Sequence, residues 1–315
     1  MSEHQLITAK AFAPAAISSF FEIHDTEADM PIVDLERVGA RGGGFGLEKG
    51  VLTQVTVEEA KIPGLTVTIN GNLAPEAETT RLVMETLLNS LPKSYVVKVD
   101  HKIEVPVGAG FGTSAGGALT SGLALKKALE LPLTYNQIGR IAHTAEIKCQ
   151  TGLGTVSALA FTGGCVLVIE PGAPGICQLD RIPLTSDYRV VAGFFQSNMP
   201  KKVLSDSEKK LAINRYGKRT LQAILAEPSL ENFLERCWEF SQEAGFVTGR
   251  VRQLVGLARK AGAIGAAQNM IGEAVHALVR EENANQVAEA FRQVLPKENV
   301  IESGIDFEGA RLVRQ

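Results

Sequence analysis

The segment from Pro106 to Leu119, PVGAGFGTSAGGAL, constrains this chain more than any other. Its three alternating glycines let the backbone turn sharply and approach another group closely. The run that follows, SAGGALTSGLALKKALEL, is apolar enough for a buried helix and ends before Pro132. A glycine loop that enters a helix exposes unpaired N–H groups at the positive end of the helix dipole. The segment therefore predicts a phosphate-binding site, with tight helix–strand packing as the structural alternative.

Two better-known phosphate loops are excluded by the spacing. The P-loop needs a lysine before its Ser or Thr, whereas here Gly112 is followed directly by Thr113 and Ser114. The dinucleotide fingerprint needs G-x-G-x-x-G and an acid at the end of a second strand. Here the spacing is G-x-G-x-G, and the acid about 20 residues on, Glu130, lies inside a helical run.

The composition is that of an ordinary soluble protein and excludes several partners. The 315 residues are 45% hydrophobic and 21% charged, with a net charge of −3. The absence of a basic block argues against nucleic acid, and the short, interrupted apolar runs argue against a membrane. The N-terminus lacks a signal-peptide pattern, so we expect a cytoplasmic protein. Four scattered cysteines without a C-x-x-C pair favour reduced thiols over zinc or disulfides.

The order of extended and helical patterns predicts an α+β fold in two domains. Val-, Ile- and Thr-rich or alternating segments predict strands, and the 3.6-residue apolar period predicts helices near 79–91, after the glycine loop, and from about 136. Either Thr134 or Asn136 is suited to cap the last of these helices. The strongest composition break is PGAPG, Pro171–Gly175. We therefore predict an N-terminal domain over residues 1–172 and a mainly helical C-terminal domain over residues 173–315.

Phosphoryl transfer needs a magnesium ligand as well as a phosphate loop. Ser114 lies in the first turn of the helix after the loop, and Glu146 lies near the end of the next helix. Magnesium takes one or two protein oxygens together with phosphate oxygens and water, so this pair suffices. The alternative for Glu146 is a solvated glutamate at a helix end, paired with Lys148 or unpaired.

PVGAGFGTSAGGAL resembles the central ATP-binding motif of the GHMP kinases, roughly P-x-G-x-G-L-G-S-S-A, with Phe111 in place of Leu and Thr113 in place of the first Ser. AKAFAPAAISSFFEIH resembles the opening motif of that superfamily, and AGAIGAAQNMIGEAVHAL stands where its third glycine motif is found. Within the superfamily, AFAPAAISSFF, RGGGFGLEKGV, TAEIKCQTGLGTVSALAFTGG and GAAQNMIGEAVHAL are similar to the archaeal pantoate kinase family. The resemblance runs from residue 11 to residue 278.

This resemblance implies a GHMP kinase fold, with a ribosomal-S5-like N-terminal domain and a ferredoxin-like C-terminal domain. It implies ATP-dependent phosphorylation of pantoate to 4-phosphopantoate in archaeal coenzyme A biosynthesis, with Mg²⁺ held by Ser114 and Glu146. The nucleotide-binding residues carried over from the motif are Pro106, Gly108, Ala109, Gly110, Gly112, Thr113 and Ser114. A homodimer is one possible assembly.

Two positions depart from the family pattern. The opening motif often carries a lysine, or a histidine in pantoate kinases, where this chain has Ala16. The family places a catalytic aspartate nine residues after the metal-binding glutamate, and here that position is Thr155. A threonine hydroxyl hydrogen-bonds an acceptor alcohol but is too weakly acidic to serve as a general base at pH 7. The alternatives are a kinase without a base, a relative with another small hydroxy acid or alcohol as substrate, and a catalytically weakened nucleotide-binding regulator.

Arg41 is the candidate substrate-binding residue. It lies in GARGGGFGLEKG, which reads as a glycine-rich loop, and pantoate has a carboxylate that the forked guanidinium group matches. The alternative is a loop arginine that faces solvent.

Overall fold

The computed structural model describes residues 6–161, 163–195, 207–270 and 272–314, and within them two sheets with helices packed against each. The larger sheet has the order β14-β1-β4-β7-β5-β6, with β8 beside β4 and β9 beside β8. Its strands are β1 (Ile7–His24), β4 (Gly39–Glu59), β5 (Gly64–Ile69), β6 (Asn72–Leu73), β7 (Tyr95–Ile103), β8 (Cys165–Glu170), β9 (Gln178–Ile182) and β14 (Arg311–Val313). A short hairpin of β2 (Thr26–Glu27) and β3 (Met30–Pro31) follows β1.

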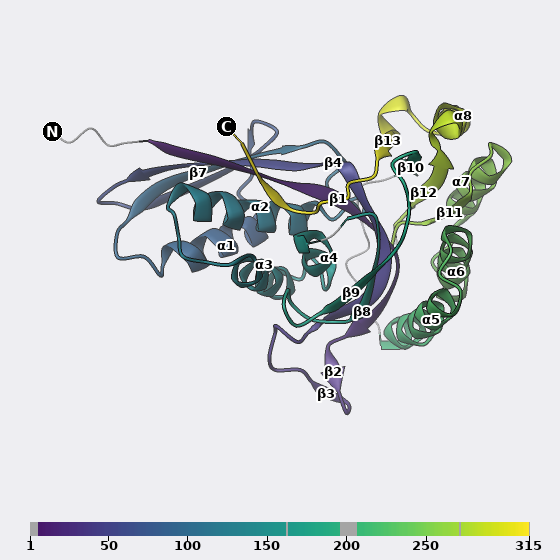
Figure 1. Cartoon of the computed structure of the whole chain (residues 1–315), viewed down its shortest axis with the longest axis horizontal. Helices are drawn as coiled ribbons and strands as arrows, with labels where there is room; N and C mark the ends of the chain where they lie inside the picture. The colour runs from purple at the N-terminus through teal and green to yellow at the C-terminus, as the bar shows by residue number, and fades with distance from the viewer. Residues whose placement is uncertain (1–5, 162, 196–206, 271, 315) are drawn as a thin grey trace.

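Helices α1 to α4 accompany the larger sheet, and helices α5 to α8 lie at the other end of the molecule together with a second sheet (Figure 1). The first group is α1 (Glu78–Leu88), α2 (Thr113–Ala128), α3 (Tyr135–Cys149) and α4 (Thr155–Phe161). The second sheet has the order β11-β12-β10-β13, from Gly265–Gln268, Ala274–Arg280, Tyr188–Phe194 and Val300–Gly304. Helices α6 (Leu230–Glu243), α7 (Gly249–Lys260) and α8 (Glu281–Arg292) pack against it, and a 3₁₀ turn, η1, forms at Lys297–Asn299. Helix α5 (Ser207–Ala226) packs instead against β1, β4 and α6. The α+β prediction is confirmed.

The predicted helices form where the apolar period placed them, with small shifts at their ends. Helix α1 ends at Leu88, three residues before the predicted end at 91. Thr134, rather than Asn136, caps α3: its hydroxyl accepts from the N–H of Gln137, whose side chain accepts from the N–H of Thr134. This reciprocal pair is a capping box, which satisfies two helix-end donors at once. Helix α4 was not predicted, because seven residues are too short to show an apolar period.

The predicted loop GARGGGFGLEKG is wrong: the segment is the first half of β4, paired with β1. The pairing runs from Ile7↔Val57 to His24↔Gly39 with two register shifts. At Gly44 a Cβ atom would lie 1.7 Å from the carbonyl oxygen of Ile17, so only glycine permits the observed approach. Glycines that read as a loop from sequence are therefore sites of close strand contact.

The division at residue 172 remains a prediction, and several contacts cross it. Strand β9 lies beyond this point but pairs with β8, and β14 pairs with β1. The far ends of β1 and β4 also pack against helix α6: the rings of Phe20 and Phe45 meet the ring of Phe233 edge-on, at centroid distances of 6.1 and 5.5 Å. One hydrophobic cluster thus includes residues from both sheets.

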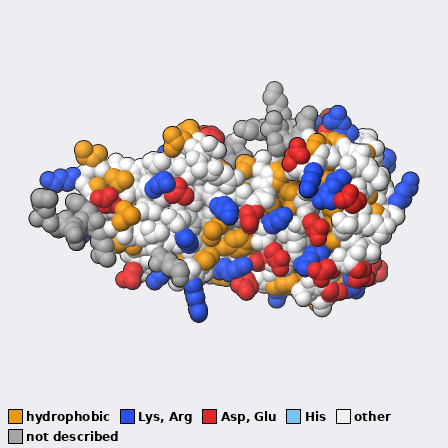
Figure 2. All heavy atoms as spheres, turned by 90° about the horizontal axis from the view of Figure 1, so that it is seen from above, with side chains coloured by type: hydrophobic (Ala, Val, Ile, Leu, Met, Phe, Trp, Pro, Cys, Tyr) orange, Lys and Arg blue, Asp and Glu red, His pale blue; other side chains and the backbone are white. Residues whose placement is uncertain are grey.

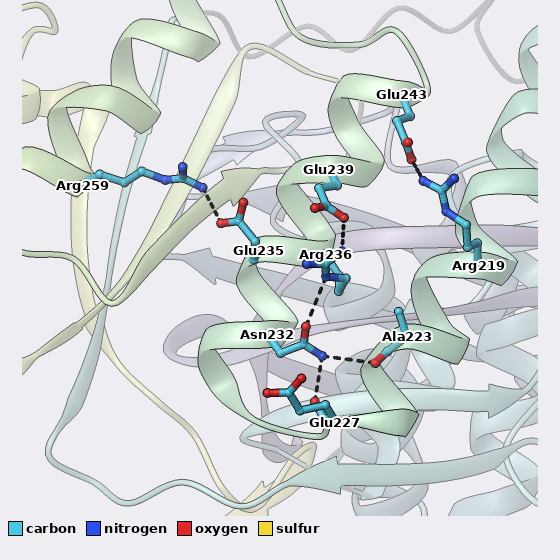
Figure 3. A network of polar contacts seen from close by, with 9 residues as sticks. All are labelled: Arg219, Ala223, Glu227, Asn232, Glu235, Arg236, Glu239, Glu243 and Arg259. Carbon is cyan, nitrogen blue, oxygen red and sulfur yellow. Dashed lines mark hydrogen bonds and ion pairs between the residues drawn. The ribbon is translucent and has the colours of Figure 1, made fainter.

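Polar contacts join helices α5, α6 and α7 (Figure 3). The Asn232 side chain on α6 donates to the carbonyl oxygens of Ala223 and Glu227, at 3.1 and 2.8 Å. These carbonyls belong to the end of α5, where the helix itself supplies no donor. Arg219 pairs with Glu243 between α5 and α6, and Arg259 pairs with Glu235 between α7 and α6.

The surface of this end of the molecule mixes acidic and basic side chains, as the right-hand part of Figure 2 shows. Cross-element pairs such as Arg189 with Glu281 belong to this pattern. Among the residues that the structure describes, no helix has both the length and the apolar character needed to cross a bilayer.

The glycine contact between β1 and β4 yields a stability prediction. Gly44→Ala should lower the free energy of unfolding by about 2–3 kcal/mol, because the added methyl group forces two paired backbones apart. Gly46→Ala is the matched control on the same strand, since a Cβ there would meet its nearest atom at 3.6 Å. It should change stability by no more than about 0.5 kcal/mol in urea unfolding. Equal losses in the two variants would contradict this explanation of the glycine tract.

Candidate active site

The glycine loop joins β7 to α2 and leaves the N-terminus of that helix open. Gly108, Gly110 and Gly112 have φ angles of 80°, 81° and 62°, the left-handed region that favours glycine. Gly112 is the N-cap of α2 and offers no side chain to the first N–H groups. Unpaired N–H groups at the positive end of a helix dipole favour an anion, so the loop has the geometry that the predicted phosphate site requires.

Three separate motifs meet at Gly112. A Cβ atom on this residue would lie 2.9 Å from Cγ2 of Thr155 and 3.1 Å from Cβ of Ala16. The N–H of Ala16 donates to the carbonyl oxygen of Phe111 at 3.0 Å, which ties the glycine loop to β1. Thr155, the first residue of α4, and Ala16 on β1 therefore both lie against the N-terminus of α2.

Glu146 is buried beside the same helix end. Its side chain is only 3% exposed, which excludes the alternative of a solvated helix-end glutamate. Burial raises the pKa of Glu146, while hydrogen bonds from the hydroxyls of Ser114 and Thr151 oppose this shift. Thr151 Oγ1 donates to Glu146 Oε1 at 2.9 Å, and a Cβ on Gly152 would lie 2.3 Å from Oε2. The turn after α3 thus wraps around the carboxylate, and its glycine is required for that contact.

Two hydroxyl groups in this cluster were missed from the sequence. Ser114 Oγ donates to Thr79 Oγ1 at 3.2 Å, and Thr79 Oγ1 lies 2.9 Å from Thr151 Oγ1. Thr79 comes from α1, 35 residues before Ser114. A Thr-Thr pair at the start of a helix carries no recognisable chemistry, so only the packing of α1 against α2 identifies it.

His101 is a buried residue of β7 that contacts hydroxyl groups close to this cluster. Its Nδ1 lies 2.7 Å from Thr53 Oγ1 on β4, and its Nε2 lies 3.0 Å from Thr80 Oγ1 on α1. Burial lowers the pKa of His101 to about 4, with a small opposing effect from Asp100. The ring is therefore neutral at pH 7. Through its contacts with Thr53 and with Thr80, the neighbour of Thr79, it connects β7 to β4 and α1.

The third glycine motif forms β11, the turn after it and the first part of β12; its Ile271 lies outside the described residues. A Cβ on Gly110 would meet Cβ of Asn269 at 3.5 Å, so this turn touches the glycine loop. His276 Nδ1 donates to Asn269 Oδ1 at 2.8 Å, and its Nε2 lies 2.9 Å from Ser19 Oγ. Burial lowers the pKa of His276 to about 3.

Arg41 is half-buried on β4, and its guanidinium group already has three acceptors. It donates to the carbonyl oxygen of Ile169 at 3.1 Å, to Glu22 at 3.4 Å and to Glu170 at 2.8 Å. The neighbouring carbonyl, that of Ala40, lies close to Gly154, directly before Thr155. The backbone of Arg41 is thus near the site, while its charge is neutralised by two carboxylates.

Within the described ranges, no group of three or more His, Cys, Asp or Glu side chains gathers as a metal centre. The oxygen atoms that do gather are one carboxylate and three hydroxyls, from Glu146, Ser114, Thr79 and Thr151. All of these are hard ligands of the kind that Mg²⁺ prefers.

Comparison with known proteins agrees with this geometry. Residues 78–163 match the family described as "GHMP kinases N terminal domain". A pantoate kinase of Thermococcus kodakarensis is 32% identical over 284 residues, 88% of this chain and 89% of that protein. A solved structure described as "Phosphotransferase related to CoA biosynthesis pathway" is 30% identical, with a TM-score of 0.82 over 98% of this chain and 99% of that one. A structure of MDDEF with MVAPP, AMPPCP and magnesium, 14% identical, shares the fold at a TM-score of 0.72 over 99% of this chain and 100% of that one.

The fold and the site define an ATP-dependent phosphotransferase that uses an alcohol group as acceptor. The chain belongs to the GHMP kinases, and its relatives over nearly the whole length include pantoate kinases. The resemblance recognised in the sequence is confirmed.

The buried histidines predict how stability depends on pH. His101 and His276 stay neutral in the folded protein down to pH values of about 4 and 3, whereas in the unfolded chain they bind protons below about pH 6.5. Stability should therefore fall as the pH falls from 6.5 to 5, with a slope that approaches about 1.4 kcal/mol per pH unit for each histidine.

His101→Gln should remove one of these contributions, as measured by urea unfolding at several pH values. The difference between variant and parent isolates His101, because Glu146 and the surface carboxylates contribute equally to both proteins. Parallel pH profiles for the two proteins would contradict the neutral, buried state of this ring.

Proposed function

We propose that this chain transfers the γ-phosphoryl group of ATP to the hydroxyl of pantoate, giving 4-phosphopantoate for coenzyme A synthesis of the archaeal type. The observation that carries the proposal is the buried Glu146 carboxylate beside Ser114 at the open N-terminus of α2. Similarity to pantoate kinases over 88% of the chain supports the choice of acceptor. The proposal includes a cytoplasmic location and a homodimer as a possible assembly.

The nucleotide phosphates would lie on the loop from Pro106 to Ser114, where Gly108, Gly110 and Gly112 keep the backbone N–H groups accessible. Ala109 and Phe111 are buried beneath the loop and hold its shape. Thr113 and Ser114 begin α2, so their N–H groups belong to the unpaired set at the helix end.

Ser114 and Glu146 would hold Mg²⁺. A buried carboxylate whose pKa is raised by desolvation gains most from a cation beside it, because the interactions that now oppose the shift are neutral hydroxyls. The donor set therefore fits the ion. When bound, Mg²⁺ neutralises charge on the phosphate oxygens.

Thr155 would position the acceptor alcohol without acting as a base. This role is supported by the position of its methyl group, which lies against Gly112 at the N-terminus of α2. Phosphoryl transfer passes through a loose transition state and depends mainly on positioning and electrostatic stabilisation. A hydroxyl that orients the acceptor is therefore compatible with turnover.

A coupled assay of ADP release tests this function. With ATP and Mg²⁺, pantoate should support a turnover well above that with homoserine, mevalonate or shikimate. Glu146→Gln keeps the shape of the side chain and should lower kcat at least about 100-fold, and adding Ser114→Ala should cost little more, since residues that act as one unit fail together. A higher specificity constant for another acceptor would contradict the pantoate assignment. Additive losses would contradict a shared ion.

Arg41 as the carboxylate-binding residue has its own test. A substrate carboxylate would have to displace Glu170, whose side chain is 54% exposed and hence readily released. Glu170→Gln should then lower the KM for pantoate several-fold, because a competing charge is removed, whereas Arg41→Lys should raise it about 10-fold through loss of the fork. The KM for ATP is the internal control. Equal changes for both substrates would indicate that Arg41 has a structural role.

A further inference from the structure

Four oxygen-bearing side chains form a continuous hydrogen-bonded series from α2 to the carboxylate. Ser114 Oγ lies 3.2 Å from Thr79 Oγ1, which lies 2.9 Å from Thr151 Oγ1, which lies 2.9 Å from Glu146 Oε1. Thr79 is 4% exposed and Glu146 is 3% exposed, so these two groups are shielded from water, whereas Ser114 is partly buried and Thr151 is exposed. The series links α1, α2 and the turn after α3.

The number of hydroxyl protons in this series determines which group donates in each hydrogen bond. Each hydroxyl has one proton to donate, and the carboxylate of Glu146 accepts only. Thr151 donates to Glu146, so the contact between Thr151 and Thr79 must use the proton of Thr79. The lone pairs of Thr79 are then free to accept from Ser114.

The direction matters because Ser114 has a second acceptor within reach. Its hydroxyl also hydrogen-bonds Glu146, and a single proton serves one acceptor at a time. When Thr79 accepts that proton, the oxygens of Glu146 keep a lone pair that Ser114 would otherwise occupy. The lone pairs of Ser114 also then point away from Thr79. Both effects leave oxygen lone pairs available to a cation.

We propose that Thr79 is a positioning residue that draws the Ser114 proton inward, so that Ser114 and Glu146 present lone pairs to the metal of a bound nucleotide. This inference rests on the proposed role of Ser114 and Glu146 as magnesium ligands. Thr79 acts through these residues and does not itself touch the substrate.

The neighbouring Thr80 provides a matched control. It lies on the same helix turn, is 5% exposed, and its hydroxyl contacts His101 Nε2 rather than Ser114. Thr79→Val and Thr80→Val each remove one buried hydroxyl at nearly constant volume. Their costs to stability should therefore be similar, whereas only Thr79→Val should affect the metal.

Calorimetric titration with AMPPCP, once with Mg²⁺ and once with EDTA, separates metal-dependent from metal-independent binding. Thr79→Val should weaken binding about 10-fold in Mg²⁺ and less than about 2-fold in EDTA, the scale of one hydrogen bond to a charged group. Thr79→Ser restores the hydroxyl and should bind within about 3-fold of the parent. In turnover assays, Thr79→Val should lower kcat and leave the KM for pantoate unchanged. Thr80→Val should bind AMPPCP like the parent in both titrations.

Any other result of these titrations would contradict one specific part of the proposal. If Thr79→Val binds AMPPCP with Mg²⁺ like the parent while Glu146→Gln does not, the role of Thr79 is wrong and the proposed function stands. If Glu146→Gln also binds like the parent, the metal site itself is wrong. Equal weakening of Thr79→Val in Mg²⁺ and EDTA, or no rescue by Thr79→Ser, would assign Thr79 a purely structural role. Should Thr79→Val fail to fold, Thr79→Ala gives the same readings from a smaller side chain.

Discussion

The antiparallel pairing of β1 with β4 connects the two ends of the molecule within the part of the chain that the structure describes. These strands run together from Ile7↔Val57 to His24↔Gly39, and they reach from the helices around α2 to the helices around α6. At one end they carry the aromatic residues Phe20 and Phe45 into the second half of the structure. In their middle they present Ala16 to the glycine loop. The close backbone approach at Gly44, which leaves no room for a Cβ atom, is part of this pairing.

The site depends on a carboxylate that burial makes costly to ionise. Glu146 lies beneath the surface, where neutral hydroxyls provide only partial compensation for a negative charge. Such an arrangement loses stability in the free protein and gains it when a cation arrives. The N-terminus of α2 lies beside this carboxylate and favours the opposite kind of ligand, because its unpaired N–H groups attract anions. A nucleotide complexed with a metal ion, as proposed above, would supply both the cation and the anion.

Features that depend on neighbouring residues could be predicted from the sequence, whereas features that depend on contacts with distant segments could not. The glycine loop and α2 were predictable because left-handed φ angles and an uncapped helix start are encoded within a few residues. The capping box at Thr134 is local for the same reason. The glycine tract before Phe45 was misread as a loop, because the contact that requires those glycines comes from β1, about 27 residues earlier in the chain. Helix α4 and strand β9 were missed because both are short.

The sequence by itself determined the α+β class, the glycine loop that leads into α2 and, through resemblance, membership of the GHMP kinases. These follow from local periodicity and from a motif whose glycines cannot be replaced without strain. Only the tertiary structure decided that Glu146 is buried rather than solvated, that Thr79 and Thr151 join Ser114 around it, and that Arg41 is held by two carboxylates. Burial and hydrogen-bond partners depend on which distant segments pack together, and a hydroxyl in the sequence carries no record of its neighbour in space.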